Sequence, residues 1–146
     1  MNSAAKANTS SAVQLSDTPI PPALVTEGKQ VARTWTAAQS LDQLVTQGVW
    51  ECTAGKFPWD YAWDEFVMVL EGEAVITPEN GNPLTLRAGD FGYFPSGLKV
   101  EWHVPKYIRK TFGAARSLSR QGGRENQKMT PTSASQAEEG ADVTEE

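Results

Sequence analysis

Apolar and polar residues alternate along much of the middle of the chain, and turn residues interrupt the alternation at short intervals. The clearest case is the segment 98–104, in which every second residue from Leu98 to Val104 is apolar. The residues between them are polar, charged or histidine. An alternation with a period of two residues predicts a β-strand that turns one face towards a core.

The densest apolar stretch lies between Trp59 and Gly72, where five consecutive apolar residues, 66–70, follow two carboxylates. A short continuous run of this kind predicts a strand with both faces covered, which Gly72 would end. A helix is the alternative, because Met, Leu and Glu favour helices. Asp64 and Glu65 stand just before the run. A carboxylate beside a buried strand needs a partner, a metal ion or a proton, so these two residues are candidates for function.

Turn signals separate the other predicted strands. Asn80-Gly81 lies between the apolar runs 74–77 and 84–86, and predicts a hairpin because both residues tolerate a positive φ. Further short strands are predicted over 23–25, 31–36, 48–53, 91–94, 98–104 and 107–112. Many short strands at close spacing, separated by Gly, Pro and Asn, are typical of an all-β sandwich or barrel with antiparallel strands.

Composition divides the chain into three parts. Residues 1–22 are rich in Ala, Ser, Thr and Asn and are predicted to form a disordered arm, with a transit peptide as the alternative. Residues 23–113 form the predicted β-barrel domain. Residues 114–146 are a polar tail, basic and then acidic, for which disorder is predicted and partner binding is the alternative. A domain this small leaves room for pairing into a homodimer.

Charge and length narrow the class of protein. The chain has 146 residues and a net charge of −5, from 13 basic and 18 acidic residues. An acidic chain without a basic stripe argues against binding to nucleic acid and to anionic membranes. No apolar run is long enough to span a bilayer, and residues 1–11 show no apolar signal segment. We therefore predict no nucleic-acid or membrane partner.

The single cysteine, Cys52, shares an apolar face with Trp50 in the alternating segment 48–53. A cysteine in such a position is more often a small core residue than a nucleophile. A lone cysteine also forms no internal disulfide, which predicts a cytoplasmic or otherwise reducing location.

Three glycine-containing segments follow one another along the chain: Leu70-Glu71-Gly72-Glu73, Ala88-Gly89-Asp90 and Phe94-Pro95-Ser96-Gly97. They resemble the sequence boxes of the cupin superfamily. The closer resemblance is to small cupins of the ureidoglycine aminohydrolase type, with an RmlC-like fold, and it is carried by residues 48–57, Asp64-Glu65-Phe66, Glu101-Trp102 and Arg109-Lys110. It covers roughly residues 31–112 and implies an antiparallel jelly-roll (cupin) barrel of about six to eight strands with a pocket at its mouth.

The histidines that hold a metal ion in metal-binding cupins are replaced in this chain. Glu65 matches the family's metal-binding carboxylate, but the three histidine positions carry Trp59, Tyr61 and Val100. The chain's single histidine, His103, is predicted to point away from the barrel interior. We therefore predict no metal and no cofactor. A weak metal site made of Glu65, Tyr61 and water is the alternative.

The pocket that the resemblance implies keeps aromatic and acidic residues. The predicted ligand-binding residues are Trp59, Tyr61, Glu65, Val67, Val100 and Trp102. Aromatic rings suit a ligand with a flat or cationic part, and Glu65 would supply charge or a proton. The alternative is that the aromatic side chains simply fill the barrel. A buried Glu65 needs a basic partner. The candidates are Lys99, Lys106, Arg109 and Lys110.

Two functions from different classes follow. The first is a cupin that binds a small molecule without a His-ligated metal, as a sensor, carrier or accessory domain. The second is an enzyme acting on a small nitrogenous or carbonyl compound, with Glu65 as general acid/base and Tyr61 assisting. The resemblance implies an aminohydrolase activity, but in that family the activity depends on the metal site that is replaced here. A structural or interaction module is a third reading, and the sequence does not decide whether the protein is an enzyme.

Overall fold

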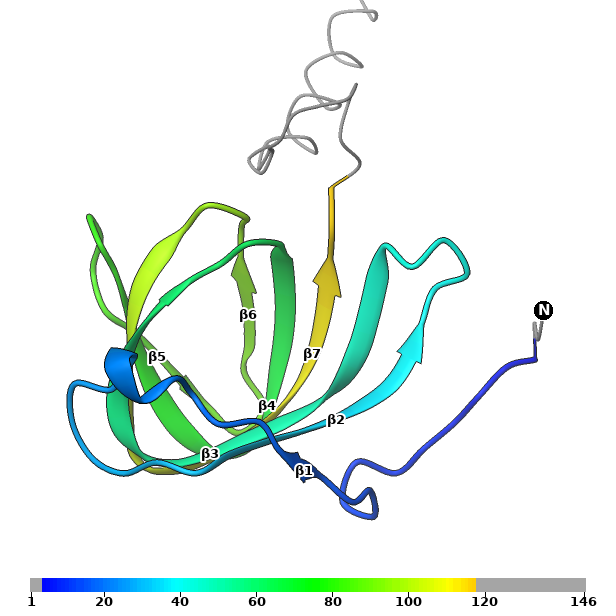
Figure 1. Cartoon of the computed structure of the whole chain (residues 1–146), viewed down its shortest axis with the longest axis horizontal. Coiled ribbons are helices and arrows are strands. Elements are labelled where there is room, and N and C mark those ends of the chain that lie inside the picture. Colours follow the sequence, from blue (N-terminus) through cyan, green and yellow to red (C-terminus); the bar gives the residue numbers. More distant parts are fainter. Residues whose placement is uncertain (1–3, 118–146) are drawn as a thin grey trace, which may run out of the picture.

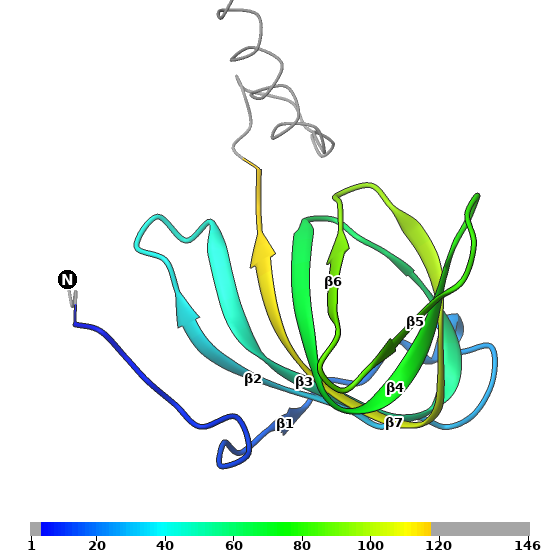
Figure 2. The same ribbon diagram turned by 180° about the vertical axis from the view of Figure 1, so that it is seen from behind.

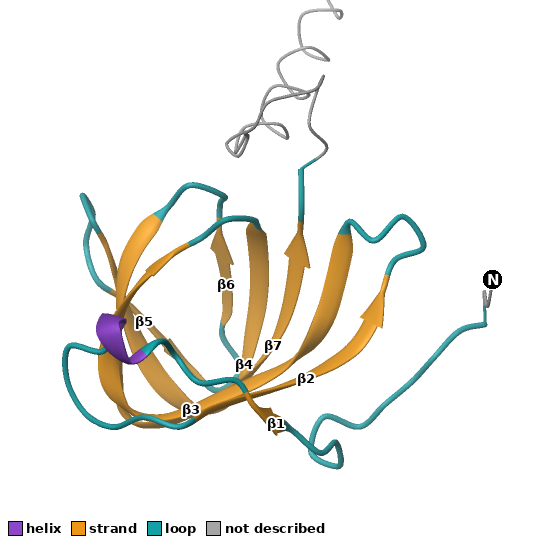
Figure 3. Ribbon diagram, viewed as in Figure 1, coloured by secondary structure: helices purple, strands orange, loops and turns teal. Residues whose placement is uncertain are grey.

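The computed structural model describes residues 4–117, and nearly all of the regular structure in them is β-strand. Its elements are β1 (Ser16–Asp17), the short 3₁₀ turn η1 (Pro22–Leu24), β2 (Ala32–Gln39), β3 (Val45–Asp60), β4 (Asp64–Pro78), β5 (Leu84–Arg87), β6 (Phe91–Phe94) and β7 (Lys99–Ala115). All pairs of neighbouring strands are antiparallel, and the sheet rolls up into a barrel (Figures 1 and 3). The all-β antiparallel class predicted from the sequence is confirmed.

The last strand, β7, is the centre of the sheet. It pairs with β3 along one side, from Lys99 opposite Asp60 to Ala115 opposite Val45, and with β4 along the other. The strand order is β1-β2-β3-β7-β4-β5, with β6 also paired to β4. Figure 2 shows β4, β7 and β3 curling together around the barrel. Every side chain that points inwards from these strands therefore faces one shared interior.

Five of the predicted short strands turn out to be parts of three longer ones. The segment 48–53 belongs to a 16-residue β3, and the segments 66–70 and 74–77 belong to one 15-residue β4. The segments 98–104, apart from Leu98, and 107–112 lie in a 17-residue β7. The register shifts between Thr53 and Gly55 and between Gly72 and Val75. Such β-bulges let a long strand bend sharply without ending. The prediction that Gly72 ends a strand is therefore wrong.

The hairpin predicted at Asn80-Gly81 is confirmed, because residues 73–76 of β4 pair with residues 84–87 of β5. The segment 23–25 differs from its prediction, since Pro22–Leu24 form the 3₁₀ turn η1 and no strand. A proline at the start fixes φ at a value that a helical turn accepts.

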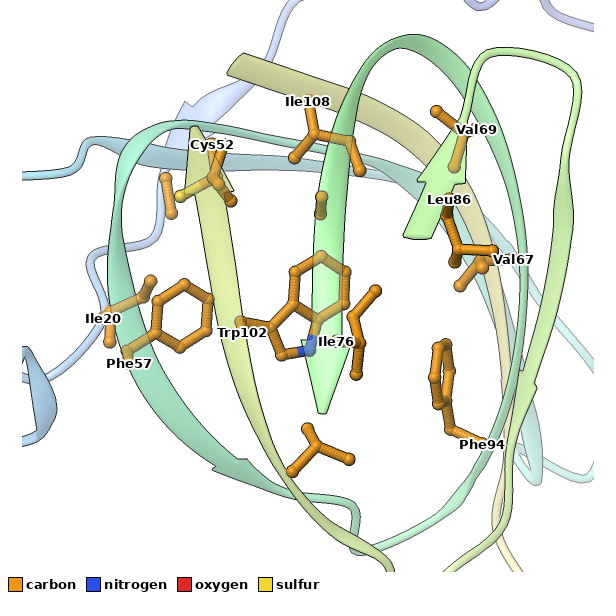
Figure 4. Close-up of a cluster of buried hydrophobic side chains, with 14 of the residues drawn as sticks. Ile20, Cys52, Phe57, Val67, Val69, Ile76, Leu86, Phe94, Trp102 and Ile108 are labelled. Carbon is orange, nitrogen blue, oxygen red and sulfur yellow. The ribbon is translucent and has the colours of Figure 1, made fainter. Parts of the chain in front are cut away.

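The core lies inside the barrel. Trp102, Val104, Ile76 and Phe94 are among its buried members, and Figure 4 shows the Trp102 indole near the middle of the cluster. The alternation predicted for 98–104 holds, since Val100, Trp102 and Val104 are buried while His103 lies on the other face.

The structure differs from the disordered arm predicted for residues 1–22. Within that segment, β1 pairs with β2, and the backbone N–H of Thr18 donates to the carbonyl oxygen of Ala32 at 2.9 Å. Ile20 is only 8% exposed and belongs to the core cluster, where it lies beside Phe57 (Figure 4). One large apolar side chain and a few backbone hydrogen bonds thus hold residues 16–20 against the barrel.

The polar tail predicted over 114–146 lies outside the described residues from residue 118 on. Its first two residues, Ala114 and Ala115, belong to β7. None of the helical structure within residues 4–117 is long and apolar enough to cross a membrane.

Candidate functional site

A cavity of about 330 Å³ lies between the barrel interior and the N-terminal arm. Its wall contains six aromatic side chains, one of them the phenol of Tyr61, and two charged side chains. The lining residues are Thr18, Pro19, Ile20, Pro21, Thr34, Trp50, Phe57, Trp59, Tyr61, Glu65, Trp102, Lys110 and Phe112. The volume stands at the lower end of the roughly 300–1,000 Å³ that ligand pockets span, so the cavity suits a small molecule.

Four of the six predicted ligand-binding residues line this one cavity. They are Trp59, Tyr61, Glu65 and Trp102. The other two, Val67 and Val100, are not among its lining residues and are core residues, 3% and 5% exposed. Their side chains point inwards as predicted, but they pack in the core.

Glu65 has a basic partner, which is Lys110. The Lys110 Nζ donates to Glu65 Oε2 at 2.8 Å, and the side chains are 5% and 19% exposed. Of the four basic candidates named from the sequence, it is Lys110 that occupies the barrel interior. Residues 108–112 of β7 alternate, so that Ile108, Lys110 and Phe112 share the inward face.

Aromatic rings surround the Lys110 ammonium group. Its Nζ lies 4.9 Å from the ring centre of Trp50, 5.6 Å from that of Phe112 and 5.8 Å from that of Trp102. Each of these distances is within the range at which a ring face attracts a cation. The cation–π role that the sequence assigns to a ligand is therefore filled by a side chain of the protein itself.

Tyr61 is held by its neighbours in one orientation. Its ring stacks on Phe94 with centroids 4.9 Å apart, and its hydroxyl oxygen accepts a hydrogen bond from Trp102 Nε1 at 3.1 Å. Burial, together with the negative charge of Glu65, raises the pKa of the Tyr61 phenol far above its ordinary value. Tyr61 is thus a neutral hydrogen-bond donor at physiological pH.

Asp64, the other carboxylate before the central run, has a structural role. Its Oδ1 accepts a hydrogen bond from the backbone N–H of Ser96 at 2.8 Å, which ties the start of β4 to the turn after β6. Asp64 is not among the residues that line the cavity. The two adjacent carboxylates therefore differ in function: Asp64 braces the fold and Glu65 faces the cavity.

The residues at the barrel mouth do not fit the metal centre that the fold family implies. Within residues 4–117, no three His, Cys, Asp or Glu side chains lie close enough together to hold a metal ion. The oxygen donors facing the cavity are those of Glu65, Tyr61 and two threonines, and the Lys110 ammonium is already bound to Glu65. First-row transition metals are held in proteins chiefly by imidazole, thiolate and carboxylate groups, of which the cavity offers one.

The sequence reasoning missed two parts of this site. The rings of Trp50, Phe57 and Phe112 also line the cavity, and so do residues 18–21 of the arm. The rings of Trp50 and Phe112 were detectable, because alternation puts Trp50 on one face with Cys52 and Phe112 on one face with Trp102. Phe57 was not, because it faces inwards together with Trp50 only through the register shift between Thr53 and Gly55. The arm was not, since its composition carries no such pattern.

Cys52 is a core residue, as predicted. It is fully buried, and burial raises the pKa of its thiol to about 12. A thiol in that environment stays protonated and unreactive.

Comparison with known proteins identifies the relatives of this domain. The family model of the EutQ-like cupin domain matches residues 39–112. A curated protein of Salmonella typhimurium, named acetate kinase EutQ, is 40% identical over 53 residues, which are 36% of this chain and 23% of that protein. The chain therefore spans less than a quarter of the length of that relative.

Solved structures of other proteins have the same fold. An ethanolamine utilization protein Q of Salmonella typhimurium LT2 is 27% identical with a TM-score of 0.54, over 60% of this chain and 72% of the other. The EutQ protein of Clostridium difficile is 20% identical with a TM-score of 0.54, over 68% and 81% of the two chains. A Pseudomonas syringae pv. tomato protein of unknown function is 23% identical with a TM-score of 0.66, over 71% of this chain and 45% of the other.

The last two structures show the fold alone. Together with the family match, they bear out the jelly-roll cupin barrel predicted from the sequence boxes, while the ureidoglycine aminohydrolase type is not shown by these matches. The match to the family model covers half of the chain. It includes most of β3, β4 and β7, which carry most of the cavity's rings and its two charged side chains. The chain belongs to the EutQ-like cupin domain family.

Proposed function

We propose that this domain binds a small organic molecule in the cavity between the barrel and the arm, without a metal ion held by histidines. The observation that carries the proposal is the wall of this cavity, in which a buried Lys110–Glu65 ion pair and the Tyr61 phenol are set among aromatic rings. A few polar groups converging in a mainly apolar pocket are typical of ligand sites. The role would be that of a sensor, a carrier or an accessory domain.

The rings supply most of the binding free energy in this proposal. Trp59 stands at the edge of the cavity, 38% exposed, and meets Phe57 edge to face with ring centroids 6.4 Å apart. A flat ligand covering these rings would remove apolar surface from water. The polar groups would fix its orientation.

The enzyme alternative is not favoured. A general base needs a free carboxylate, but Glu65 is bound to the Lys110 ammonium. Tyr61 is kept protonated by burial and by the Glu65 charge, so that it donates and does not take up protons. The kinase activity in the name of the Salmonella relative is not carried over, because the match covers 23% of that protein.

The cytoplasmic location and the homodimer stay predictions.

Ligand-observed NMR tests the proposal with single-ring probes such as benzamide, benzoate and benzamidine. We expect saturation transfer from the protein to at least one probe. Replacing Trp59 with Ala should weaken that binding by about 2- to 10-fold, because an aromatic contact contributes about 0.5–1.5 kcal/mol.

Phe91→Ala is the matched control. Phe91 is 77% exposed and does not line the cavity, so this variant should bind like the wild type. If no probe binds, or if both variants weaken binding equally, this proposal is wrong.

A further inference from the structure

The formal charges that line the cavity cancel. Glu65 and Lys110 are the charged residues among those in its wall, and they are paired at 2.8 Å. A ligand with a net charge would add an unpaired charge to a space lined largely by apolar side chains, and burying an unpaired charge is costly. The balance of charge therefore favours an uncharged ligand.

The aromatic rings give a second reason to exclude a cation. Trp50, Phe112 and Trp102 already lie around the Lys110 ammonium. A cationic ligand close to these rings would also lie close to Lys110, and like charges repel. The faces of the cavity's rings that point towards the arm remain available to a flat, neutral group.

Two polar atoms in the wall have hydrogen-bonding capacity left. Tyr61 accepts from Trp102, and no atom within residues 4–117 accepts a hydrogen bond from its hydroxyl. Glu65 uses Oε2 for Lys110, and no hydrogen bond within the same residues reaches its Oε1. Tyr61 and Glu65 line the same cavity. The wall thus offers both a neutral donor and an acceptor to one ligand.

We propose that the cavity recognises an uncharged, flat molecule that carries a carbonyl oxygen beside an N–H group, as a carboxamide or a lactam does. The carbonyl accepts from the Tyr61 hydroxyl, the N–H donates to Glu65, and the ring lies against Trp59 and Phe57. This inference rests on the proposed function and names the class of ligand for the same cavity.

Three probes of nearly equal shape test the class. Benzamide is neutral, benzoate is an anion and benzamidine is a cation at neutral pH. Titrations followed by tryptophan fluorescence, with Trp50, Trp59 and Trp102 in the wall as reporters, should show benzamide binding about tenfold or more tighter than either ion.

The outcomes separate the two proposals. If benzoate or benzamidine binds more tightly than benzamide, the ligand class is wrong while binding in the cavity stands. If none of the three binds, the proposed function fails and the ligand class with it.

Charge variants supply an independent readout. Glu65→Gln leaves Lys110 unpaired and should shift the preference towards benzoate, while Lys110→Met leaves Glu65 unpaired and should shift it towards benzamidine. The double variant removes both charges and should again prefer benzamide. Glu73→Gln, the same change at an exposed carboxylate paired with Arg87 outside the cavity, should leave the preference unchanged.

Unfolding curves show which variants are folded. If a single variant does not fold, the wild-type comparison of the three probes still decides the proposal. A folded Glu65→Gln variant that keeps the wild-type order of affinities would overturn the proposed ligand class. The preference for benzamide would then not arise from charge balance.

Discussion

Lys110 is a charged residue at a position where alternation along β7 calls for an apolar one. Its neighbours on the inward face are Ile108 and Phe112, and its side chain is 5% exposed. The barrel accepts the ammonium because Glu65 neutralises it and aromatic ring faces surround it. Neither side chain of the pair would be tolerated well without the other.

A double-mutant cycle measures this dependence. Lys110→Met and Glu65→Gln should each lower the free energy of unfolding at neutral pH by about 3 kcal/mol, since each leaves a buried partner without its counter-charge. The double variant should lose clearly less than the sum. Urea unfolding of the four proteins gives the coupling, and losses that simply add would contradict the pairing.

Another carboxylate, that of Glu51, is buried and braces the outer face of the barrel. It is 4% exposed and accepts hydrogen bonds from Tyr107 Oη at 2.7 Å, Arg33 Nε at 2.7 Å and Arg109 Nη1 at 2.8 Å. Burial alone would raise the pKa of Glu51, but the bonds from Tyr107 and Arg33 and the charges of both arginines outweigh it and hold the pKa below its ordinary value. Arg109 also donates to the carbonyl oxygen of Ser10 at 2.6 Å and so fastens the arm.

The lowered pKa of Glu51 predicts a pH dependence of stability. Because the folded-state pKa lies below the unfolded-state one, the stability that Glu51 contributes is present above about pH 4.3 and is lost as pH falls through the folded-state pKa. Glu51→Gln should be less stable at neutral pH by about 3 kcal/mol and should lose less stability than the wild type on acidification. Urea midpoints between neutral pH and pH 3 test this, and parallel curves for the two proteins would contradict it.

At the scale of the elements, bulges let β3, β4 and β7 run the length of the barrel. Gly72, in β4, has φ +75° at the register shift opposite β7. A Cβ there would collide with the carbonyl oxygen of Tyr107. The bend therefore depends on glycine for two reasons, the sign of φ and the closeness of the neighbouring backbone.

Two glycine variants separate these reasons. Gly89 has φ +96° but no atom within 4 Å of where a Cβ would stand, so Gly89→Ala should cost only the conformational penalty of about 1–2 kcal/mol. Gly72→Ala should cost clearly more, because the backbone of β7 has to move as well. Chemical denaturation of both variants measures the difference. Equal losses of unfolding free energy would show that the β7 backbone moves at this point at little cost.

At the scale of the whole molecule, the residue pattern predicts which way side chains face better than where strands end. The period-two alternation at 98–104 and the turn at Asn80-Gly81 act locally, and both predictions are confirmed. A glycine that ends a strand and one that bends it look alike in sequence. The difference lies in pairing with β7, in which the partner of Gly72 is Ile108, more than 30 residues away along the chain.

The candidate site could be predicted in part, because the residue pattern predicts which way side chains face. Trp59, Tyr61, Glu65 and Trp102 line one cavity because the resemblance and the alternation both place them on the inner face. That Lys110 would be the partner of Glu65, and that the arm would close the wall, depended on how distant segments pack. No local pattern carries that information.

The ion pair between Lys110 and Glu65 predicts how the whole domain responds to metals. A metal that binds the folded state at a hundred times its dissociation constant adds about 2.7 kcal/mol, which would raise the melting temperature of a domain this size by about 10 °C or more. We expect no such rise with Mn²⁺, Fe²⁺, Ni²⁺ or Zn²⁺, because Glu65 is bound to Lys110 and the cavity offers no imidazole. Lys110→Met should also show none, since freeing Glu65 still leaves a single strong ligand. A rise in the wild type that Glu65→Gln abolishes would mean that the carboxylate prefers a metal ion to its lysine.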